Sequence, residues 1–388
     1  MPYIKEDFKD RLIQNADIVQ VFHHFGDEPQ KKGAHYFCNS PFAQEKTPSC
    51  WVNQRTQRYK CFSTGNSGDV INYIQHKLKC SFTEAVEELA KIQNTSVEYE
   101  KPELAEKKEA KAKAQKELRK YLEALVPKFQ EELQKLPKDH PAWHDIAKRQ
   151  YTEQDLNLWK IGYAPGSQFI YQLFSEAGAV EIGKKLGLIN DKNQDKLWNK
   201  LIYPIYNEND KICGFASRNL DNNSDFAKWM NPSENELYHK DRVLFGFNFA
   251  KNAIAKENRV WIVEGYNDVI AWQKLGIYNT IAASGTAISE TQISMIKKLT
   301  SKVTLCFDGD TPGKRAIAKY LPILISKGFS VEICQLPDHL DPDDYSRKFA
   351  KEQEGQEIDI EKSLQPYLIN GFSALLLENF DAKLDELD

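Results

Sequence analysis

The alternation of hydrophobic and polar residues predicts a small sheet near the start of the chain. Short strands with alternating apolar residues are expected at residues 35–38, 50–52 and 59–62. Helical periodicity is expected at residues 7–25, 70–78 and 85–92. Asp69 and Ser81 precede the last two helices and are suitable N-caps. Residues 1–98 are therefore predicted to form a first domain of helices and a β-sheet.

The next segment, residues 99–138, lacks this alternation and consists mostly of Lys, Glu, Ala and Leu. That composition is typical of a solvated helix or a semi-rigid spacer. We expect a charged helical linker here, separating the first domain from the rest of the chain.

Two further patterns follow the linker. Residues 139–255 are mixed, with a helix expected at 145–159 and strands at 200–206, 211–218 and 226–230. Residues 256–350 alternate between helices and apolar strands, and the strands are expected at 259–264, 280–283, 303–307 and 331–335. This rhythm predicts a parallel sheet with helices on its faces. Residues 351–388 are expected to be a C-terminal helical segment, so the fold class is multidomain α+β and α/β.

Composition narrows the classes of function. The 388 residues carry 52 basic and 56 acidic side chains, a net charge of −4, which excludes a uniformly basic DNA-coating protein but allows local basic patches. No apolar run reaches the ~18 residues of a membrane helix, and the N-terminus lacks a signal-peptide pattern. A cytoplasmic protein without a membrane partner is expected. The seven cysteines include no CxxC pair, which argues against a disulfide framework and a four-cysteine zinc site.

Acidic residues gather where three of the predicted apolar strands end. The clusters are Glu264 with Asp268, Asp308 with Asp310, and Asp341 with Asp343 and Asp344. Ligands of open α/β sheets bind beyond the carboxyl ends of the strands, so the clusters are expected to converge on one edge. Residues 284–286 follow another strand and would add hydroxyl and amide groups there. One such cluster is ordinary for a turn or a helix cap, but three favour a site.

Clustered carboxylates repel one another unless cations neutralise them. Oxygen ligands without histidine or thiolate select hard cations, so Mg²⁺ or Mn²⁺ is expected rather than zinc. Two such ions can activate an attacking hydroxyl and stabilise the leaving oxygens of a phosphoryl displacement. The acidic clusters therefore predict metal-dependent phosphoryl transfer.

The motifs at these strand ends resemble the TOPRIM catalytic core, most closely that of bacterial DnaG-type primases. They are EGYND (264–268), ASGTA (283–287), FDGD (307–310) and DPDD (341–344). The resemblance implies that Glu264 is a metal ligand or a general acid/base, supported by Asp268. It also implies that two or more Mg²⁺ or Mn²⁺ ions are held by Glu264, Asp308, Asp310, Asp341 and Asp343.

The resemblance continues upstream, where basic residues are spaced along strands and loops. The matching motifs are IGYAP (161–165), LIYPI (201–205), GFASR (214–218) and KWMN (228–231). In this context the candidates for binding nucleotide and template phosphates are Lys200, Arg218, Lys228 and Lys240. Trp229 and Tyr238 lie beside them in sequence and are candidates for stacking on bases. For any single cation an ordinary surface position is the better interpretation, and only the set in matching order favours binding.

The first domain resembles the primase zinc ribbon, but its metal ligands are mostly lost. The family's three cysteines and one histidine correspond here to Ser40, Ala43, Cys61 and Thr64. A structural zinc site needs four thiolate or imidazole donors, so no zinc is expected. An alternative set of His35, Cys38, Cys50 and Cys61 has a spacing that matches no ribbon pattern. Aromatic residues are expected to supply the core instead.

Basic residues also concentrate in this domain. Residues 31–68 contain six lysines and arginines but one acid. Basic and aromatic residues interleaved along strands fit a single-stranded template surface, although solvated sheets show the same alternation.

Taken together, the resemblance implies a DNA-dependent RNA primase that makes short RNA primers on single-stranded DNA from ribonucleoside triphosphates. The setting would be a bacterial cell or a phage-infected host, and a replicative helicase is a further partner that the family implies. Two alternatives remain open at this point. One is a TOPRIM nuclease that uses the same acids, and the other is a non-catalytic nucleic-acid-binding protein of a phage or mobile element.

Overall fold

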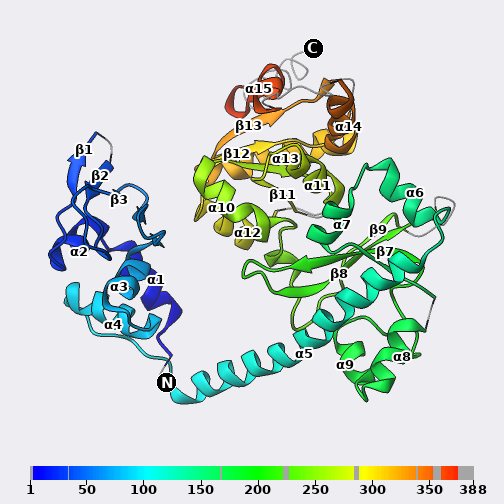
Figure 1. Ribbon diagram of the computed structural model, residues 1–388, viewed down its shortest axis with the longest axis horizontal. Helices are drawn as coiled ribbons and strands as arrows, with labels where there is room; N and C mark the ends of the chain where they lie inside the picture. Colours follow the sequence, from blue (N-terminus) through cyan, green and yellow to red (C-terminus); the bar gives the residue numbers. More distant parts are fainter. Residues whose placement is uncertain are drawn as a thin grey trace, which may run out of the picture. The chain divides into compact units, whose positions relative to one another are not determined.

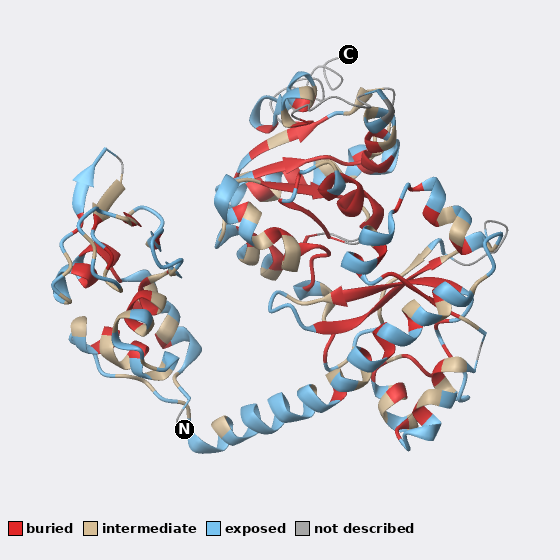
Figure 2. Ribbon diagram, viewed as in Figure 1, coloured by how far each residue is buried: buried red, intermediate tan, exposed pale blue. Residues whose placement is uncertain are grey.

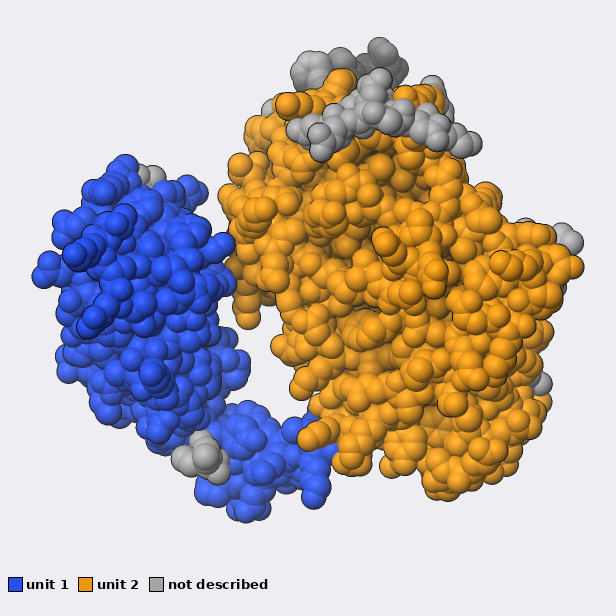
Figure 3. All heavy atoms as spheres, in the orientation of Figure 1, with its two compact units in different colours: residues 1–113 blue, residues 114–388 orange. Residues whose placement is uncertain are grey.

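The computed structural model describes residues 3–33, 35–166, 168–221, 227–283, 288–337, 340–352 and 360–374 (Figure 1). The chain divides into two compact units, residues 1–113 and 114–388, which Figure 3 colours separately. This division falls inside the charged segment that was predicted to be a linker.

The first unit contains one antiparallel sheet with helices before and after it. The strands, in their order across the sheet, are β1 (Gln30–Lys32), β2 (His35–Cys38), β3 (Cys50–Asn53), β4 (Arg58–Cys61) and β5 (Ser67–Gly68). The helices are α1 (Glu6–Gln14), α2 (Ile18–His24), α3 (Val70–Leu78) and α4 (Phe82–Ile92). The single helix predicted at residues 7–25 is wrong, because Asp17 accepts a hydrogen bond from the Val19 amide and caps a second helix.

The caps predicted for the last two helices of this unit are confirmed. Asp69 accepts hydrogen bonds from the Ile71 and Asn72 amides, and Ser81 forms a capping box with Glu84. Of the aromatic residues expected to supply the core, Tyr59 is buried, but Phe62 is 65% exposed and the others are half-buried (Tyr36, Phe37, Phe42 and Trp51). Phe22 and Tyr73 complete the core, and their rings stack with centroids 3.8 Å apart.

The charged segment forms one long helix, α5 (Pro102–Lys135), with two different halves. Its first half is exposed, as predicted for a spacer. Its second half is part of the core of the second unit, through the buried residues Leu118, Leu122, Leu125, Val126, Phe129 and Leu133. The sequence analysis did not predict this apolar stripe, because charged residues dominate the composition of the segment.

The second unit begins with an antiparallel sheet and its surrounding helices. Across the sheet the strands are β6 (Gly162–Ala164), β7 (Lys200–Tyr206), β8 (Ile212–Asn219) and β9 (Trp229–Met230). The helices are α6 (Pro141–Lys148), α7 (Glu153–Trp159), α8 (Phe169–Glu176) and α9 (Val180–Lys185), followed by the short turn η1 (Lys240–Arg242). The helix predicted at 145–159 is therefore interrupted, since Thr152 caps α7 in a capping box with Asp155.

The rest of the unit is built on a five-stranded sheet in the order β11-β10-β12-β13-β14. Its strands are β10 (Val260–Val263), β11 (Thr280–Ala282), β12 (Lys302–Leu305), β13 (Ser330–Cys334) and β14 (Leu368–Asn370). The first four strands in this order are parallel, as predicted, whereas β14 adds an antiparallel edge that was not expected.

Helices cover both faces of this sheet (Figures 1 and 2). They are α10 (Phe247–Glu257), α11 (Tyr266–Lys274), α12 (Glu290–Lys297), α13 (Thr311–Ser326) and α14 (Pro342–Glu352), with α15 (Ile360–Leu364) and the turn η3 (Gln365–Tyr367) leading into β14. Strand β10 is buried on both sides, because Val260 and Ile262 join one apolar cluster while Trp261 and Val263 join another. No helix in the described ranges combines the length and the apolar character needed to cross a membrane.

Candidate active site

Two of the predicted acids meet where the parallel strands β10 and β12 end. Glu264 follows β10 directly, and its Oε1 accepts a hydrogen bond of 3.0 Å from the backbone amide of Asp308, beyond β12. Asp310 caps α13 by accepting a 2.8 Å bond from the Gly313 amide. The strand ends and the helix start therefore orient these carboxylates from the backbone.

Asp268 supports the same edge from inside α11. It is buried, and its Oδ2 accepts a 2.9 Å hydrogen bond from the Gly265 amide, which closes the turn between Glu264 and α11. Burial, followed by the charges of Asp308 and Asp341, raises the pKa of Asp268 well above its usual value. Asp268 is thus placed as a buried support of the turn after Glu264 rather than as an exposed ligand.

The acids act on one another electrostatically. Burial and then the charges of Glu264, Asp341 and Asp310 raise the pKa of Asp308 to about 7. The pKa of Glu264 is also raised, first by burial and then by Asp310 and Asp341. Such mutual repulsion means that Glu264, Asp308, Asp310 and Asp341 lie within electrostatic range of one another.

Unsatisfied oxygens in this cluster fit a divalent cation. Asp308 Oδ1 is buried and has no hydrogen-bond partner within the described part of the chain. Oxygens of Asp341, Asp343 and Asp344 all lie within 4.8 Å of one another. A buried carboxylate oxygen without a donor and a raised pKa are both relieved by a hard cation, so the residues present fit Mg²⁺ or Mn²⁺.

Asp343 has contacts that distinguish it from the other acids. It is buried, and its Oδ2 forms ion pairs of 2.5 Å with both Arg149 and Arg347. Arg149 also lies 3.2 Å from Asp145, which in turn accepts two hydrogen bonds from Arg218.

Sequence reasoning missed Arg149, because residues 145–159 were expected to be one continuous helix. The Thr152–Asp155 capping pattern was the signal that this helix is broken.

The predicted basic residues lie in different settings. Lys228 affects the acids, since its charge offsets a small part of the rise in the pKa values of Asp308 and Asp341 that burial causes. Arg218 is buried beside Asp145 and stacks on the Trp229 ring at 5.5 Å, and its Nη1 has no hydrogen-bond partner within the described ranges.

Lys200 and Lys240 occupy other places in the fold. Lys200 is buried at the start of β7, in register with Asn219 of β8, and burial lowers its pKa. Lys240 lies in η1, where its carbonyl accepts a hydrogen bond from Gln292 of α12.

The expected aromatic partners differ in accessibility. Trp229 is half-buried and packs against Tyr203 and Tyr266, with centroids 4.9 Å apart in both cases. Tyr238 is buried, so its proposed role in stacking on bases is wrong. The segment 284–286, expected to add hydroxyl and amide groups, lies outside the described residues.

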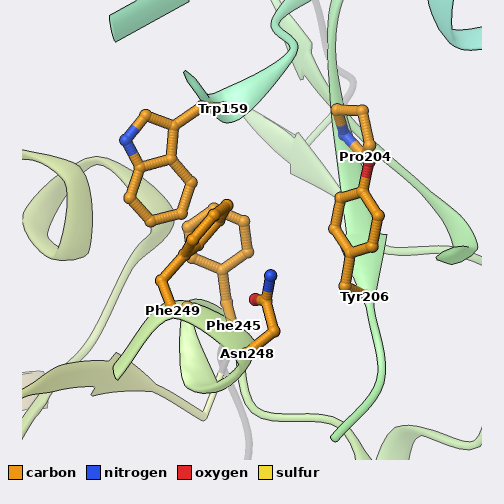
Figure 4. A pocket seen from close by; sticks show the side chains of 7 residues that line it. Trp159, Pro204, Tyr206, Phe245, Asn248 and Phe249 are labelled. Atoms are coloured by element: carbon orange, nitrogen blue, oxygen red, sulfur yellow. The ribbon is translucent and has the colours of Figure 1, made fainter. Parts of the chain in front are cut away.

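An aromatic-lined pocket lies elsewhere in the unit (Figure 4). Trp159, Phe245 and Phe249 gather on one side of it, with Tyr206 and Pro204 of β7 opposite. Its volume of about 10 Å³ is close to the least that one water molecule requires. The pocket is therefore a packing feature between α7, β7 and α10 rather than a ligand site.

In the first unit, the zinc-ligand positions form a hydrogen-bonded cluster. Ser40 Oγ lies 3.1 Å from Cys61 Sγ, and Ser63 Oγ lies 3.3 Å from the same sulfur. Glu45 Oε1 accepts hydrogen bonds of 2.5 Å from the Ser40 amide and the Ser49 hydroxyl. Burial raises the pKa of Cys61, but hydrogen bonds from Ser40, Ser63 and Thr64 outweigh it and leave the pKa at about 7.

This donor set does not fit zinc. One thiolate and two hydroxyls occupy the four ligand positions, and Ala43 offers no donor. Cys38 and Cys50 lie opposite each other across β2 and β3, and Cys50 lies opposite Cys61 across β3 and β4. All three are buried, and hydrogen bonding to Cys38 followed by burial raises the pKa of Cys50, which disfavours the thiolate that zinc requires.

The chain matches three protein families in succession. They are the CHC2 zinc finger over residues 4–105, the N-terminal domain of the DNA primase catalytic core over residues 128–251, and the Toprim-like domain over residues 261–346. These matches confirm the resemblance seen in the motifs, including that of the first domain despite its altered ligands.

Curated relatives and solved structures agree with the family matches. The chain is 32% identical over 373 residues to a DNA primase of Clostridium acetobutylicum, covering 95% of this chain and 61% of the relative. It is 30% identical over 357 residues to a DNA primase of Staphylococcus epidermidis, covering 90% of this chain and 59% of the relative. The chain thus spans about three fifths of the length of these relatives.

Two solved structures resemble this fold. The Aquifex aeolicus primase, comprising zinc-binding and RNA polymerase domains, superposes with a TM-score of 0.56 at 28% identity, covering 89% of this chain and 83% of that one. A DnaG primase catalytic domain bound to single-stranded DNA gives a TM-score of 0.60 at 27% identity, covering 70% and 84%.

Proposed function

Because the chain belongs to the family of DnaG-type DNA primases, we propose that it synthesises short RNA primers on single-stranded DNA for DNA replication. The reaction would be nucleotidyl transfer from ribonucleoside triphosphates, directed by a DNA template. The main support for this proposal is the environment of the Asp308 carboxylate. One of its carboxylate oxygens is buried without a donor in the described part of the chain, and burial followed by the charges of neighbouring acids raises its pKa to about 7.

The acids would hold the catalytic ions. Glu264, Asp308, Asp310 and Asp341 are the ligands that their placement supports, and Asp343 is treated separately below. When bound, Mg²⁺ or Mn²⁺ would activate a primer hydroxyl and stabilise the charge that develops on the leaving phosphates. The amide of Asp308 fixes the orientation of the Glu264 carboxylate, and Asp268 fixes the turn that follows Glu264. These contacts preorganise the acids before any substrate arrives.

The basic residues would bind phosphates beside the acids. Lys228 is the best placed, because its charge acts on Asp308 and Asp341. Arg218 keeps one buried guanidinium nitrogen without a partner among the described residues, which suits a phosphate oxygen of a nucleotide or template. Lys200 and Lys240 remain proposed template or nucleotide contacts at the borders of this surface.

The first unit would bind template without zinc. Exposed Lys60 lies 5.3 Å from the ring of exposed Phe62, a cation and a stacking surface on one side of β4. Hydrogen bonds among Ser40, Glu45, Ser49, Ser63 and Cys61 would replace the metal by tying the loop before β3 to the turn after β4. The protein would act in the cytoplasm of a bacterium or phage-infected host, and a replicative helicase is a partner to test by co-purification.

One experiment tests the function. The protein is incubated with single-stranded DNA, labelled ribonucleotides and Mg²⁺ or Mn²⁺, beside the double variant Asp308→Ala, Asp310→Ala. Template-dependent oligoribonucleotides that are absent from the variant support the proposal. Cleavage of the DNA without synthesis would replace it with a nuclease, and DNA binding without any metal-dependent reaction would replace it with a binding protein.

A further inference from the structure

Arg149 lies in the break between α6 and α7, and its guanidinium contacts residues of three helices, α6, α11 and α14. It is only 8% exposed. One nitrogen is 3.2 Å from Asp145 in α6, and another is 2.5 Å from Asp343 in α14. With the amide of Asn267 oriented to satisfy its neighbours, its oxygen accepts from Arg149 Nη1 at 2.8 Å while its nitrogen donates to Tyr151 at 2.9 Å.

These contacts connect two of the acidic segments to each other. Asn267 directly precedes Asp268 in α11, whereas Asp343 follows two residues after Asp341. The segments are about 75 residues apart in sequence, and Arg149 comes from neither of them. Arg218 of β8 holds Asp145 through two hydrogen bonds of 2.8 and 2.9 Å, so the guanidinium is itself anchored to the antiparallel sheet. A planar fork with several donors is suited to such bridging.

The contacts of Asp343 indicate what its carboxylate does. Arg149 and Arg347 both reach the same oxygen, and Asp343 is 5% exposed. A divalent cation bound to this carboxylate would meet two guanidinium charges at close range, which is unfavourable. Among the described residues, Glu264 and Asp308 form no ion pair, and burial raises the pKa of both, whereas Asp344 shares Arg347 with Asp343.

We propose that Arg149 is a positioning residue that sets the spacing between the acidic segments 264–268 and 341–344, with Asp343 as its anchor rather than a metal ligand. This inference rests on the proposed function only in that the acids bind Mg²⁺ or Mn²⁺. Binding of the metal can be measured without any reaction, so the two proposals fail separately.

The test measures Mn²⁺ binding to the whole chain, without nucleotide or DNA, from the electron paramagnetic resonance signal of free Mn²⁺. Arg149→Lys keeps the charge but cannot reach Asp343 and Asn267 together, so any change reports geometry rather than charge. We expect Mn²⁺ affinity to fall at least 5-fold. Arg347→Lys is the matched control, because Arg347 contacts Asp343 from the same helix and joins no segments, and its affinity should stay within 2-fold of wild type.

A double-mutant cycle separates an anchor from a ligand. Asp343→Asn should weaken Mn²⁺ binding about as much as Arg149→Lys, and the double variant should be no weaker than either one, since both break the same contact. Additive losses, or a much larger loss in Asp343→Asn, would make Asp343 a metal ligand and overturn the proposal. An unchanged Mn²⁺ affinity in Arg149→Lys with a raised KM for nucleotides would also overturn it, because Arg149 would then bind substrate.

A milder variant covers the case in which Arg149→Lys does not fold. Tyr151→Phe removes only the hydroxyl that contacts Asn267 and should weaken Mn²⁺ binding by 2- to 3-fold in the same direction. No weakening in this folded variant counts against the bridge. A wild-type protein that binds Mn²⁺ but makes no primers would refute the proposed function and leave this test intact.

Discussion

Gly313, in the first turn of α13, lies directly against the side chain of Glu264. A Cβ atom at position 313 would be 2.7 Å from Glu264 Oε1 and 2.2 Å from the carbonyl oxygen of Asp308. Both distances are shorter than a van der Waals contact, so only glycine allows α13 to approach the acids this closely. We therefore expect Gly313→Ala to displace Glu264 and reduce primer synthesis at least 10-fold, measured as the initial rate on a single-stranded template.

The matched control for this substitution is Gly166→Ala, because a Cβ at Gly166 meets no atom within 4 Å. Its rate should remain within 2-fold of wild type. Circular dichroism distinguishes displaced acids from unfolding. A folded Gly313→Ala variant with full activity would contradict the role assigned to this close approach.

The pH dependence of stability should report the charge on Asp308. Its pKa is raised from 3.8 to about 7, so the metal-free folded state loses stability as the pH rises through this window. Asp308→Asn removes the charge and keeps the shape. The unfolding temperature without metal should therefore rise by roughly 2–6 °C at pH 8 and by clearly less at pH 5, where Asp308 is still protonated in the folded state but already ionised in the unfolded chain. Saturating Mn²⁺ should stabilise the wild type more than the variant, and equal shifts at both pH values would contradict this interpretation.

The first unit should be independent of zinc. Metal analysis is expected to find far less than one zinc per chain, and EDTA should leave the unfolding temperature unchanged. Cys61→Ala removes a buried thiol that contacts Ser40 and Ser63, and should lower the free energy of unfolding of this unit by about 1–3 kcal/mol. The loss should be the same with and without added zinc. One equivalent of tightly bound zinc would show that the ligand assignment is wrong.

Substitutions in the first unit should distinguish the contribution of aromatic stacking to single-stranded DNA binding from that of charge. Phe62 is 65% exposed beside Lys60, so Phe62→Ala should weaken binding about 5- to 100-fold without changing its salt dependence. Lys60→Ala should instead reduce the slope of log affinity against log salt concentration by about one. Fluorescence anisotropy at several salt concentrations measures both quantities. Unchanged affinity in both variants would place the template elsewhere.

The alternation of apolar strands and helices predicted the parallel sheet, and the acidic residues after the strands indicated the edge of the sheet where a site was expected. The parallel pairing is confirmed, and because the strands of a parallel sheet all end on one side, connectivity alone directs Glu264 and Asp308 to the same edge. The changes at the family's zinc-ligand positions could also be recognised in the sequence, since metal ligation depends on the chemical identity of single residues such as Ser40 and Ala43.

The helix breaks come from local caps that hydrophobic periodicity does not show, because Asp17 and Thr152 each begin a new helix through side-chain bonds to nearby amides. The edge strand β14 was decided by tertiary structure, since it joins the sheet by pairing with a strand far away in sequence. In α5 the apolar stripe from Leu118 to Leu133 is outnumbered by charged residues, so composition concealed its burial.

What the sequence determined by itself is the resemblance to the primase family, the strands that the acids follow and the residue types at the family's zinc-ligand positions, because each depends on local residue identities. What only the tertiary structure decided is which charges pair. Arg149 reaches Asp343 and Asn267 across long sequence distances, and Tyr238 is buried although its sequence neighbours suggested exposure. Ion pairing and burial depend on the packing of distant segments, which no local pattern encodes.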